Sequence, residues 1–176
     1  MAKFISGMNV SLDGYVDHEA FAPGILLFRH WIGIVRDLTA SVYGRRLYEV
    51  MRYWDADDPA WSPDHRAFAE AWRKLPKWVV SGTLTSVGPN ATLISNDIEA
   101  NLRRLKTDLA GEVSVGGTLL AHYAGDIGLI DEYQLYFRPV VLGGGKPFFA
   151  GPRPPLRFVS SELIGEDAMR LRYVPN

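Results

Sequence analysis

The sequence predicts one α/β domain whose central sheet is mostly parallel, with antiparallel strands at one edge. As far as Leu119, strand-like runs alternate with segments of helical period, which is typical of parallel strands joined by helices. From Ile130 onward the runs are strand-like only, which favours antiparallel pairing. The 176 residues suffice for one sizeable core and are too few for two ordinary domains, so residues 1–176 are expected to form a single domain.

Alternation, helical period and chain breakers predict the elements of the first half. The Asp13-Gly14 pair is typical of a turn after a first strand, and apolar residues recur at helical spacing between Ile25 and Leu38. Ser62 followed by Pro63 marks a helix start, because Ser is a favoured N-cap and Pro fits the first helical position. The predicted elements are strands at 3–10 and 40–43 and helices at 25–38, about 45–53, and from 62–64 to about 74.

The second half contains two further helices and then strands alone. Asn96 with Glu99 three residues later resembles a capping box, and Gly111 is placed to stop that helix in a left-handed conformation. Another helix is expected from Thr118. Strands are predicted at 78–81, 92–95, 113–115, 130–141, 156–160 and 169–174.

Composition excludes several classes of function. The chain is 47% hydrophobic and 22% charged with a formal net charge of −1, so no bulk field recruits nucleic acid or an anionic membrane. It has no cysteine, and its four histidines lack metal-ligand spacing, so no metal site is expected. Without a signal peptide or a membrane-length apolar run, a cytoplasmic location is predicted.

Two strands end in a small residue and pass at once into a helix. Gly44 precedes Arg45-Arg46-Leu47, and Gly116-Gly117 precedes Thr118-Leu119. A helix start offers unpaired N–H groups to an anion, and glycine lets the anion approach the backbone. The arginine pair suits an additional phosphate, and a third strand end supplies the hydroxyls of Ser81 and Thr83. Together these features predict a dinucleotide site that favours NADPH over NADH.

Each pattern also has an ordinary structural interpretation. A Gly-Gly pair after a strand is common in plain turns, and two arginines at a helix start are common on solvated surfaces. The chain contains neither G-x-G-x-x-G nor G-x-x-x-x-G-K-[ST], which argues against a Rossmann or P-loop site. The Gly143-Gly144-Gly145-Lys146 run resembles a phosphate cradle, but Pro147-Phe148-Phe149 after it suits a loop better than a helix.

An ordered series of segments resembles the dihydrofolate reductase-like superfamily. Within it, the chain is most similar to stand-alone proteins related to the C-terminal reductase domain of the bifunctional riboflavin-biosynthesis deaminase-reductase. The series covers nearly the whole chain and consists of Ser11-Leu12-Asp13-Gly14-Tyr15, Tyr43-Gly44-Arg45-Arg46-Leu47-Tyr48-Glu49-Val50-Met51, Lys77-Trp78-Val79-Val80-Ser81, Val115-Gly116-Gly117-Thr118-Leu119, Ile130-Asp131-Glu132-Tyr133 and Pro139-Val140-Val141-Leu142-Gly143-Gly144-Gly145-Lys146-Pro147.

The resemblance implies a three-layer fold with helices on both faces of the sheet and an antiparallel C-terminal strand. It also implies NADPH as hydride donor, a homodimer, and a substrate similar to 5-amino-6-(5-phosphoribosylamino)uracil. Carried over by position, Gly44, Arg45, Arg46 and Leu47 face the pyrophosphate and the 2′-phosphate, Gly116, Gly117, Thr118 and Leu119 wrap the pyrophosphate, Ser81 and Thr83 line the adenosine end, and Met8, Asn9 and Val16 lie near the nicotinamide.

The resemblance places Asp13 near the substrate, where a carboxylate can hold the acceptor and relay a proton. The alternative is an ordinary Asp-Gly turn. His18 and His30 are weaker candidates for the border of the substrate pocket, and Trp54 and Trp61 for a lid or wall.

Two other functions stay open. One is a dihydrofolate or pterin reductase, although the stretch Gly24–His30 lacks the carboxylate that classical dihydrofolate reductases carry there. The other is a non-catalytic nucleotide-binding module. The strand around Tyr133–Arg138 has no cleanly polar face, which favours burial of its aromatic residues by a helix layer and a two-fold partner.

Overall fold

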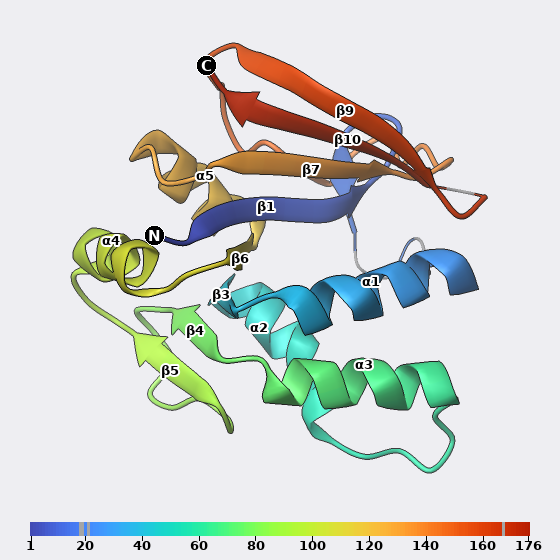
Figure 1. Cartoon of the computed structure of the whole chain (residues 1–176), viewed down its shortest axis with the longest axis horizontal. Helices are drawn as coiled ribbons and strands as arrows, with labels where there is room; N and C mark the ends of the chain where they lie inside the picture. The colour runs from blue at the N-terminus through green and yellow to red at the C-terminus, as the bar shows by residue number, and fades with distance from the viewer. Residues whose placement is uncertain (18–19, 21, 167) are drawn as a thin grey trace.

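The sheet has eight strands in the order β5-β4-β3-β6-β1-β7-β10-β9 in the computed structural model, which describes residues 1–17, 20, 22–166 and 168–176 (Figure 1). The strands from β5 to β7 are mutually parallel, and β10 runs antiparallel to both of its neighbours, β7 and β9. The predicted fold class, including the antiparallel C-terminal strand, is confirmed. The strands are β1 (Lys3–Val10), β3 (Ala40–Gly44), β4 (Lys77–Val80), β5 (Ala91–Ile94), β6 (Glu112–Gly116), β7 (Glu132–Phe137), β9 (Leu156–Ile164) and β10 (Ala168–Pro175).

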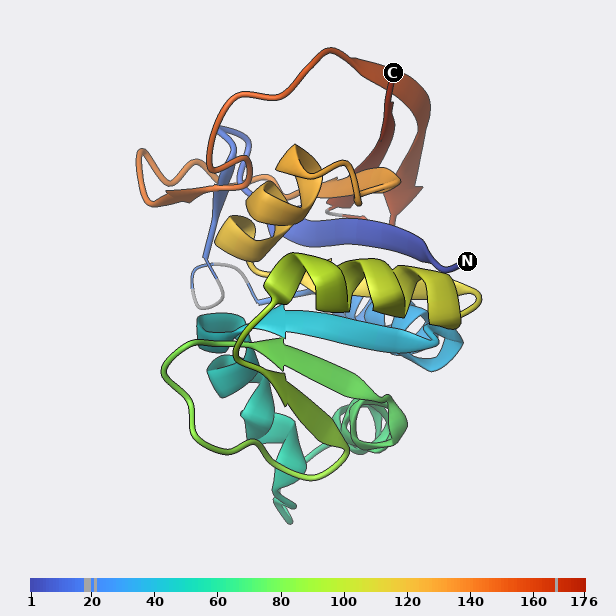
Figure 2. The same ribbon diagram turned by 90° about the vertical axis from the view of Figure 1, so that its left-hand side faces the viewer.

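Helices cover both faces of the sheet. Figure 2 shows α4 and α5 together on one face, where leucines of α4 and small residues of α5 pack on the central strands. On the other face α1 and α3 pack on each other and on β3 and β4. The helices are α1 (Ile25–Asp37), α2 (Arg45–Met51), α3 (Pro63–Lys74), α4 (Ile98–Asp108) and α5 (Thr118–Asp126), with a 3₁₀ turn at Arg52–Asp55.

The predicted start of α3 is confirmed, because Ser62 accepts a hydrogen bond from the backbone N–H of His65. Gly111 is left-handed as predicted, with a φ of 78°, but α4 already ends at Asp108 and its C-cap is the extended Leu109. The expected capping box is wrong: Asp97, at φ 44°, is the N-cap of α4 and makes no side-chain cap bond. The expected strand 130–141 is shorter, because β7 ends at Phe137 just before Pro139, which has no N–H to donate.

The tyrosines of β7 are buried within the protomer, without the help of a second chain. Tyr133 and Leu135 are buried in the core on the α5 side, and Tyr136 is buried beneath α1. The expectation that a second chain covers these side chains is therefore wrong, because both faces of β7 are covered within the protomer. The exposed apolar residues of this edge lie instead on β9 and β10, at Phe158, Leu163 and Met169.

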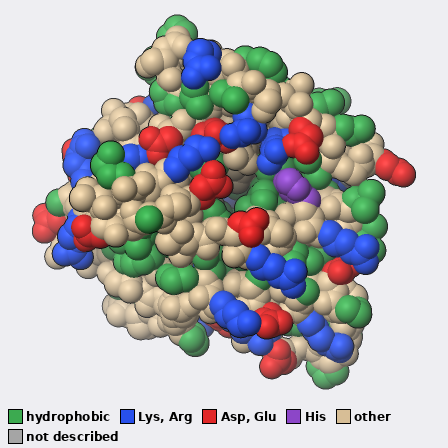
Figure 3. Space-filling model, in the orientation of Figure 1, with side chains coloured by type: hydrophobic (Ala, Val, Ile, Leu, Met, Phe, Trp, Pro, Cys, Tyr) green, Lys and Arg blue, Asp and Glu red, His purple; other side chains and the backbone are tan. Residues whose placement is uncertain are grey.

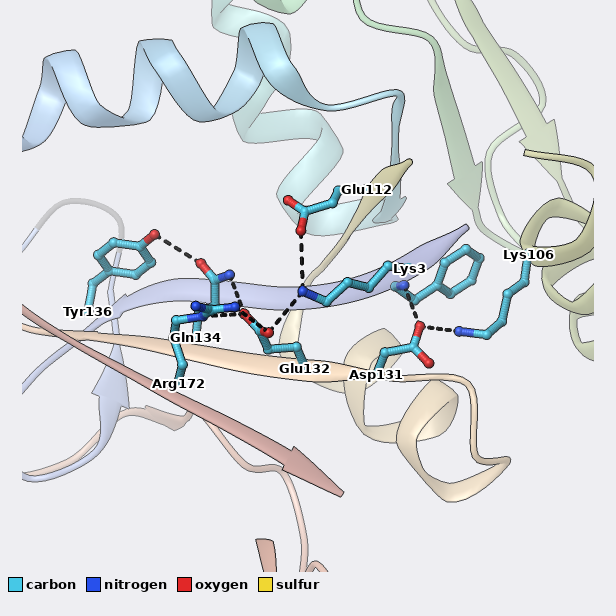
Figure 4. A network of polar contacts seen from close by, with 9 residues as sticks. Lys3, Lys106, Glu112, Asp131, Glu132, Gln134, Tyr136 and Arg172 are labelled. Carbon is cyan, nitrogen blue, oxygen red and sulfur yellow. Dashed lines mark hydrogen bonds and ion pairs between the residues drawn. The ribbon is translucent and has the colours of Figure 1, made fainter. Parts of the chain in front are cut away.

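A polar network joins three adjacent strands, β1, β7 and β10, beneath the α1 side of the sheet (Figure 4). Both carboxylate oxygens of Glu132 accept hydrogen bonds of 2.8 Å from Arg172, and Glu132 Oε2 lies 2.9 Å from the Lys3 ammonium. Gln134 donates to Glu132 at 2.7 Å and accepts from the Tyr136 hydroxyl at 3.0 Å. Because these residues come from β1, β7 and β10, the network fixes the registers of the strands that position the carboxyl end of β1.

Candidate cofactor and substrate cleft

A cleft of about 1390 Å³ opens at the carboxyl ends of the parallel strands and extends under α1. In parallel α/β sheets ligands bind at this edge, because the strand-to-helix turns meet there. The cleft brings together most of the predicted cofactor residues. Those that line it are Met8, Asn9, Val16, Gly44, Arg45, Arg46, Leu47, Gly116, Gly117, Thr118 and Leu119.

The two glycine strand ends lie side by side. Although β3 and β6 are far apart in sequence, they are neighbours in the sheet, with Tyr43 opposite Gly116. Gly117 has a φ of 101°, and a Cβ built on it would lie 3.6 Å from the Gly44 backbone nitrogen. Gly44 and Gly117 are the N-caps of α2 and α5 and, as glycines, have no side chain that could accept a hydrogen bond. The first backbone N–H groups of both helices therefore have no side-chain cap. The two turns thus form a backbone cradle that suits a phosphate.

Arg45 and Arg46 lie at the mouth of this cradle and are exposed. Arg45 makes a solvated ion pair of 3.5 Å with Glu49 one turn along α2. Arg46 makes no ion pair within the described part of the chain. Both guanidinium groups can turn toward an anion at little cost, because a surface ion pair contributes little stability.

Ser81 and Thr83 do not line the cleft. The Ser81 hydroxyl is buried and accepts hydrogen bonds from the backbone N–H groups of Thr83 and Leu84, at 3.2 and 3.0 Å. It therefore stabilises the turn after β4. The sequence pattern suggested these hydroxyls as ligand groups, because it does not reveal the turn that Ser81 stabilises.

Asp13 lies outside the cleft lining and holds a distant loop. Its carboxylate oxygens accept hydrogen bonds from the backbone N–H groups of Leu142, at 3.1 Å, and Gly143, at 2.7 Å. Hydrogen bonding from Ser11 and then from these two N–H groups lowers the pKa of Asp13. An exposed carboxylate with a lowered pKa is ionised at neutral pH and holds no proton to donate, so this geometry favours loop anchoring over acid catalysis.

The anchored loop forms one wall of the cleft. Leu142, Gly144, Gly145 and Lys146 line it, and the short strand β8 (Lys146–Pro147) pairs antiparallel with β2 (Tyr15–Val16). No helix follows the glycine run, as the sequence predicted. Asp13 and the β2–β8 pair together hold this wall beside Val16.

Of the other candidates, Trp54 lines the cleft. Trp61 does not line it; this residue is buried, and its ring centroid lies 5.4 Å from that of Trp54. His30 does not line the cleft, and its Nε2 lies 3.1 Å from the Tyr136 hydroxyl. Burial and then the nearby Arg170 lower the pKa of His30. His18 lies outside the described residues. Sequence reasoning missed the α1 side of the cleft, where Trp31, Tyr43 and Ser41 contribute.

Surface charge and helix hydropathy in the described part of the chain do not point to a further kind of site. Acidic and basic side chains are interspersed over the face that Figure 3 shows, in keeping with the net charge of −1. In the described ranges there is no group of three or more histidine, aspartate or glutamate residues placed to hold a metal ion. None of the helices described is long and apolar enough to span a bilayer.

The comparisons with known proteins place this fold among the dihydrofolate reductase-like folds. The chain belongs to the RibD C-terminal domain family, whose model matches residues 2–169. A protein from Shewanella sp. PV-4 that bears the name "putative riboflavin biosynthesis protein" superposes with a TM-score of 0.69 at 21% identity, covering 99% of this chain and 98% of that one.

Two further solved structures share the fold. One is the diaminohydroxyphosphoribosylaminopyrimidine deaminase/5-amino-6-(5-phosphoribosylamino)uracil reductase of Thermotoga maritima, with a TM-score of 0.68, 15% identity and coverage of 99% of this chain and 57% of that one. The other is dihydrofolate reductase from Enterococcus faecalis complexed with NADP(H), with a TM-score of 0.65, 14% identity and coverage of 99% and 96%. Family and neighbours together support an oxidoreductase.

Proposed function

We propose that the chain is an NADPH-dependent reductase of a small carbonyl or heterocyclic compound. The observation that carries the proposal is the pair of glycine turns at Gly44 and Gly117, which open side by side into one cleft beneath an arginine pair. A backbone cradle fits a pyrophosphate, and two guanidinium groups fit a 2′-phosphate that NADH lacks.

The residues present fit this cofactor along the length of the cleft. Gly44, Gly117 and the start of α5 would hold the pyrophosphate, and Arg45 and Arg46 the 2′-phosphate. The nicotinamide would lie against Met8 and Asn9, at the carboxyl end of β1, and against Val16 of β2. These residues line the cleft next to the wall that Asp13 anchors. When bound, NADPH supplies a hydride. The chain positions the two reactants and excludes water from the reacting faces.

Replacing Gly117 with Ala is expected to weaken NADPH binding roughly tenfold or more, which is about 1.4 kcal/mol. The added Cβ would occupy the space between the two turns, 3.6 Å from the Gly44 nitrogen, where the proposed phosphate lies. Fluorescence titration with NADPH measures the effect. Gly128→Ala is the matched control, because Gly128 also has a positive φ, 72°, but has open space around it beyond the end of α5.

If Gly117→Ala and Gly128→Ala lose stability to a similar extent and both keep full NADPH affinity, the cradle does not hold the cofactor. A loss confined to Gly117→Ala supports it.

For Asp13 we expect Asp13→Asn to loosen the wall of the cleft. Asn offers one acceptor oxygen in place of two, so one of the N–H groups of Leu142 and Gly143 loses its partner. Amide hydrogen exchange over residues 142–148 should become faster, and turnover should fall. Asp58→Asn, in a loop where Asp58 accepts from the backbone of Ala60, is the control. A large loss of turnover with unchanged exchange would instead support the catalytic role first predicted for Asp13.

Two alternative functions differ in simple assays. A pterin reductase would oxidise NADPH in the presence of dihydrofolate. The structure argues against this alternative, because α1 carries no carboxylate in its first two turns. A non-catalytic module would bind NADPH but would not oxidise it, whichever acceptor is added. A homodimer in the cytoplasm completes the proposal, and its natural contact is the apolar surface of β9 and β10 around Phe158 and Leu163.

A further inference from the structure

The part of the cleft under α1 is an apolar slot. Its walls come from α1 on one side and from the sheet and the α2–α3 region on the other. Aromatic rings dominate it, and such rings favour flat partners that stack on their faces or edges. The residues that form this slot are Phe28, Trp31, Ile34, Val35, Leu38, Tyr43, Trp54 and Phe68.

Cationic side chains are confined to other parts of the cleft. Among the described lining residues the cations are Arg45, Arg46 and Lys146, and the carboxylate is Asp17. The arginines lie at the start of α2, and Lys146 is exposed on β8, opposite Val16. A phosphate or carboxylate placed deep in the slot would lose its hydration without gaining a charged partner, which is strongly unfavourable.

Trp31 in the slot and Asn9 elsewhere in the cleft carry neutral hydrogen-bonding groups. The Trp31 indole N–H and the Asn9 side-chain oxygen are buried and lack hydrogen-bond partners within the described part of the chain. Both residues line the cleft. Neither group carries a charge, so neither offers an ion-pair partner to a charged ligand in this part of the cleft.

Building on the proposed NADPH site, we propose that the acceptor is an uncharged planar aromatic or heteroaromatic compound with a reducible C=O or C=N bond. A ribosyl phosphate, the substrate type named for the Thermotoga maritima enzyme, does not suit this slot. In the reaction, the hydride of NADPH adds to the carbonyl or imine carbon. A proton from solvent adds to the oxygen or nitrogen, and NADPH leaves as NADP⁺.

Calorimetric titration of the NADP⁺-bound chain tests the proposal without turnover, because NADP⁺ has no hydride to give. Three probes are compared: 4-nitrobenzaldehyde, its anionic counterpart 4-formylbenzoate, and uridine 5′-monophosphate. The neutral aldehyde is expected to bind roughly tenfold or more tightly than either anion. With NADPH in place of NADP⁺, the neutral aldehyde should also give the faster loss of NADPH absorbance.

A charge placed in the slot should change this preference. Ile34→Lys introduces an ammonium group on α1 and is expected to tighten 4-formylbenzoate binding roughly tenfold. Ile25→Lys makes the same change at an exposed position of the same helix outside the cleft, and should leave all three affinities unchanged. If Ile34→Lys does not fold, Leu38→Lys tests the same wall.

The outcomes separate the two proposals. Failure of NADP⁺ and NADPH to bind the unsubstituted chain overturns the proposed cofactor. Cofactor binding together with equal or tighter binding of 4-formylbenzoate or uridine 5′-monophosphate overturns the substrate class and leaves the cofactor in place.

Discussion

Replacing Arg45 and Arg46 together with Ala is expected to weaken NADPH binding by about 1.5–3 kcal/mol for each charged hydrogen bond lost, and to leave NADH binding nearly unchanged. The physical reason is that a 2′-phosphate pairs with guanidinium groups that a plain ribose does not use. Both arginines are exposed at the mouth of the cradle, and Arg45 gives up only a solvated pair with Glu49. Equilibrium titration with each cofactor measures the difference.

A matched pair of arginines provides the control. Arg103 and Arg104 lie on α4 and are not among the residues that line the cleft, so replacing both with Ala changes the net charge equally. NADPH affinity should survive this change. If both double variants weaken NADPH to the same extent, the effect is one of overall charge, and Arg45 and Arg46 do not contact the 2′-phosphate.

The second large effect is on stability, at Glu132. Glu132→Gln is expected to lower the free energy of unfolding by about 3 kcal/mol, because it leaves Arg172 without its buried anionic partner and leaves Lys3 paired only with the exposed Glu112. Chemical denaturation at neutral pH measures it. Glu112→Gln is the matched control, since Glu112 also pairs with Lys3, at 3.3 Å, but is exposed. Equal losses in the two variants would contradict a special role for the buried network.

The same carboxylate predicts a dependence of stability on pH. Burial alone would raise the pKa of Glu132, but hydrogen bonds from Arg172, Lys3 and Gln134 outweigh it and lower the pKa to about 2. Because the folded-state pKa lies below the ordinary value of 4.5, this contribution is present above pH 4.5 and is lost as the pH falls toward 2. Across that range the unfolding free energy of Glu132→Gln should fall less steeply than that of the unsubstituted chain.

Features that depend on neighbouring residues were predictable from the sequence. The change from alternating elements to strands alone indicated the parallel sheet with its antiparallel C-terminal strand. Ser62 and Pro63 indicated the start of α3, and the glycines at the ends of β3 and β6 indicated the two turns of the cradle. In each of these cases a local preference agrees with the final fold.

Features that depend on distant contacts were not predictable. Asp13 and Gly143 are 130 residues apart, and nothing near Asp13 indicates that its carboxylate holds that loop. The Ser81 hydroxyl looked available until the fold showed the turn that it stabilises. Trp31 and Val35 have the spacing of an ordinary core face of a helix, so periodicity alone does not reveal that the slot beside them is open.

The central claim is that the cleft at the carboxyl ends of β3 and β6 binds NADPH. Calorimetric titration of the unsubstituted chain with NADPH and, separately, with NADH tests it most directly. We expect one NADPH bound per chain, with an affinity clearly higher than that for NADH. Absence of NADPH binding, or equal affinity for the two cofactors, would contradict the claim.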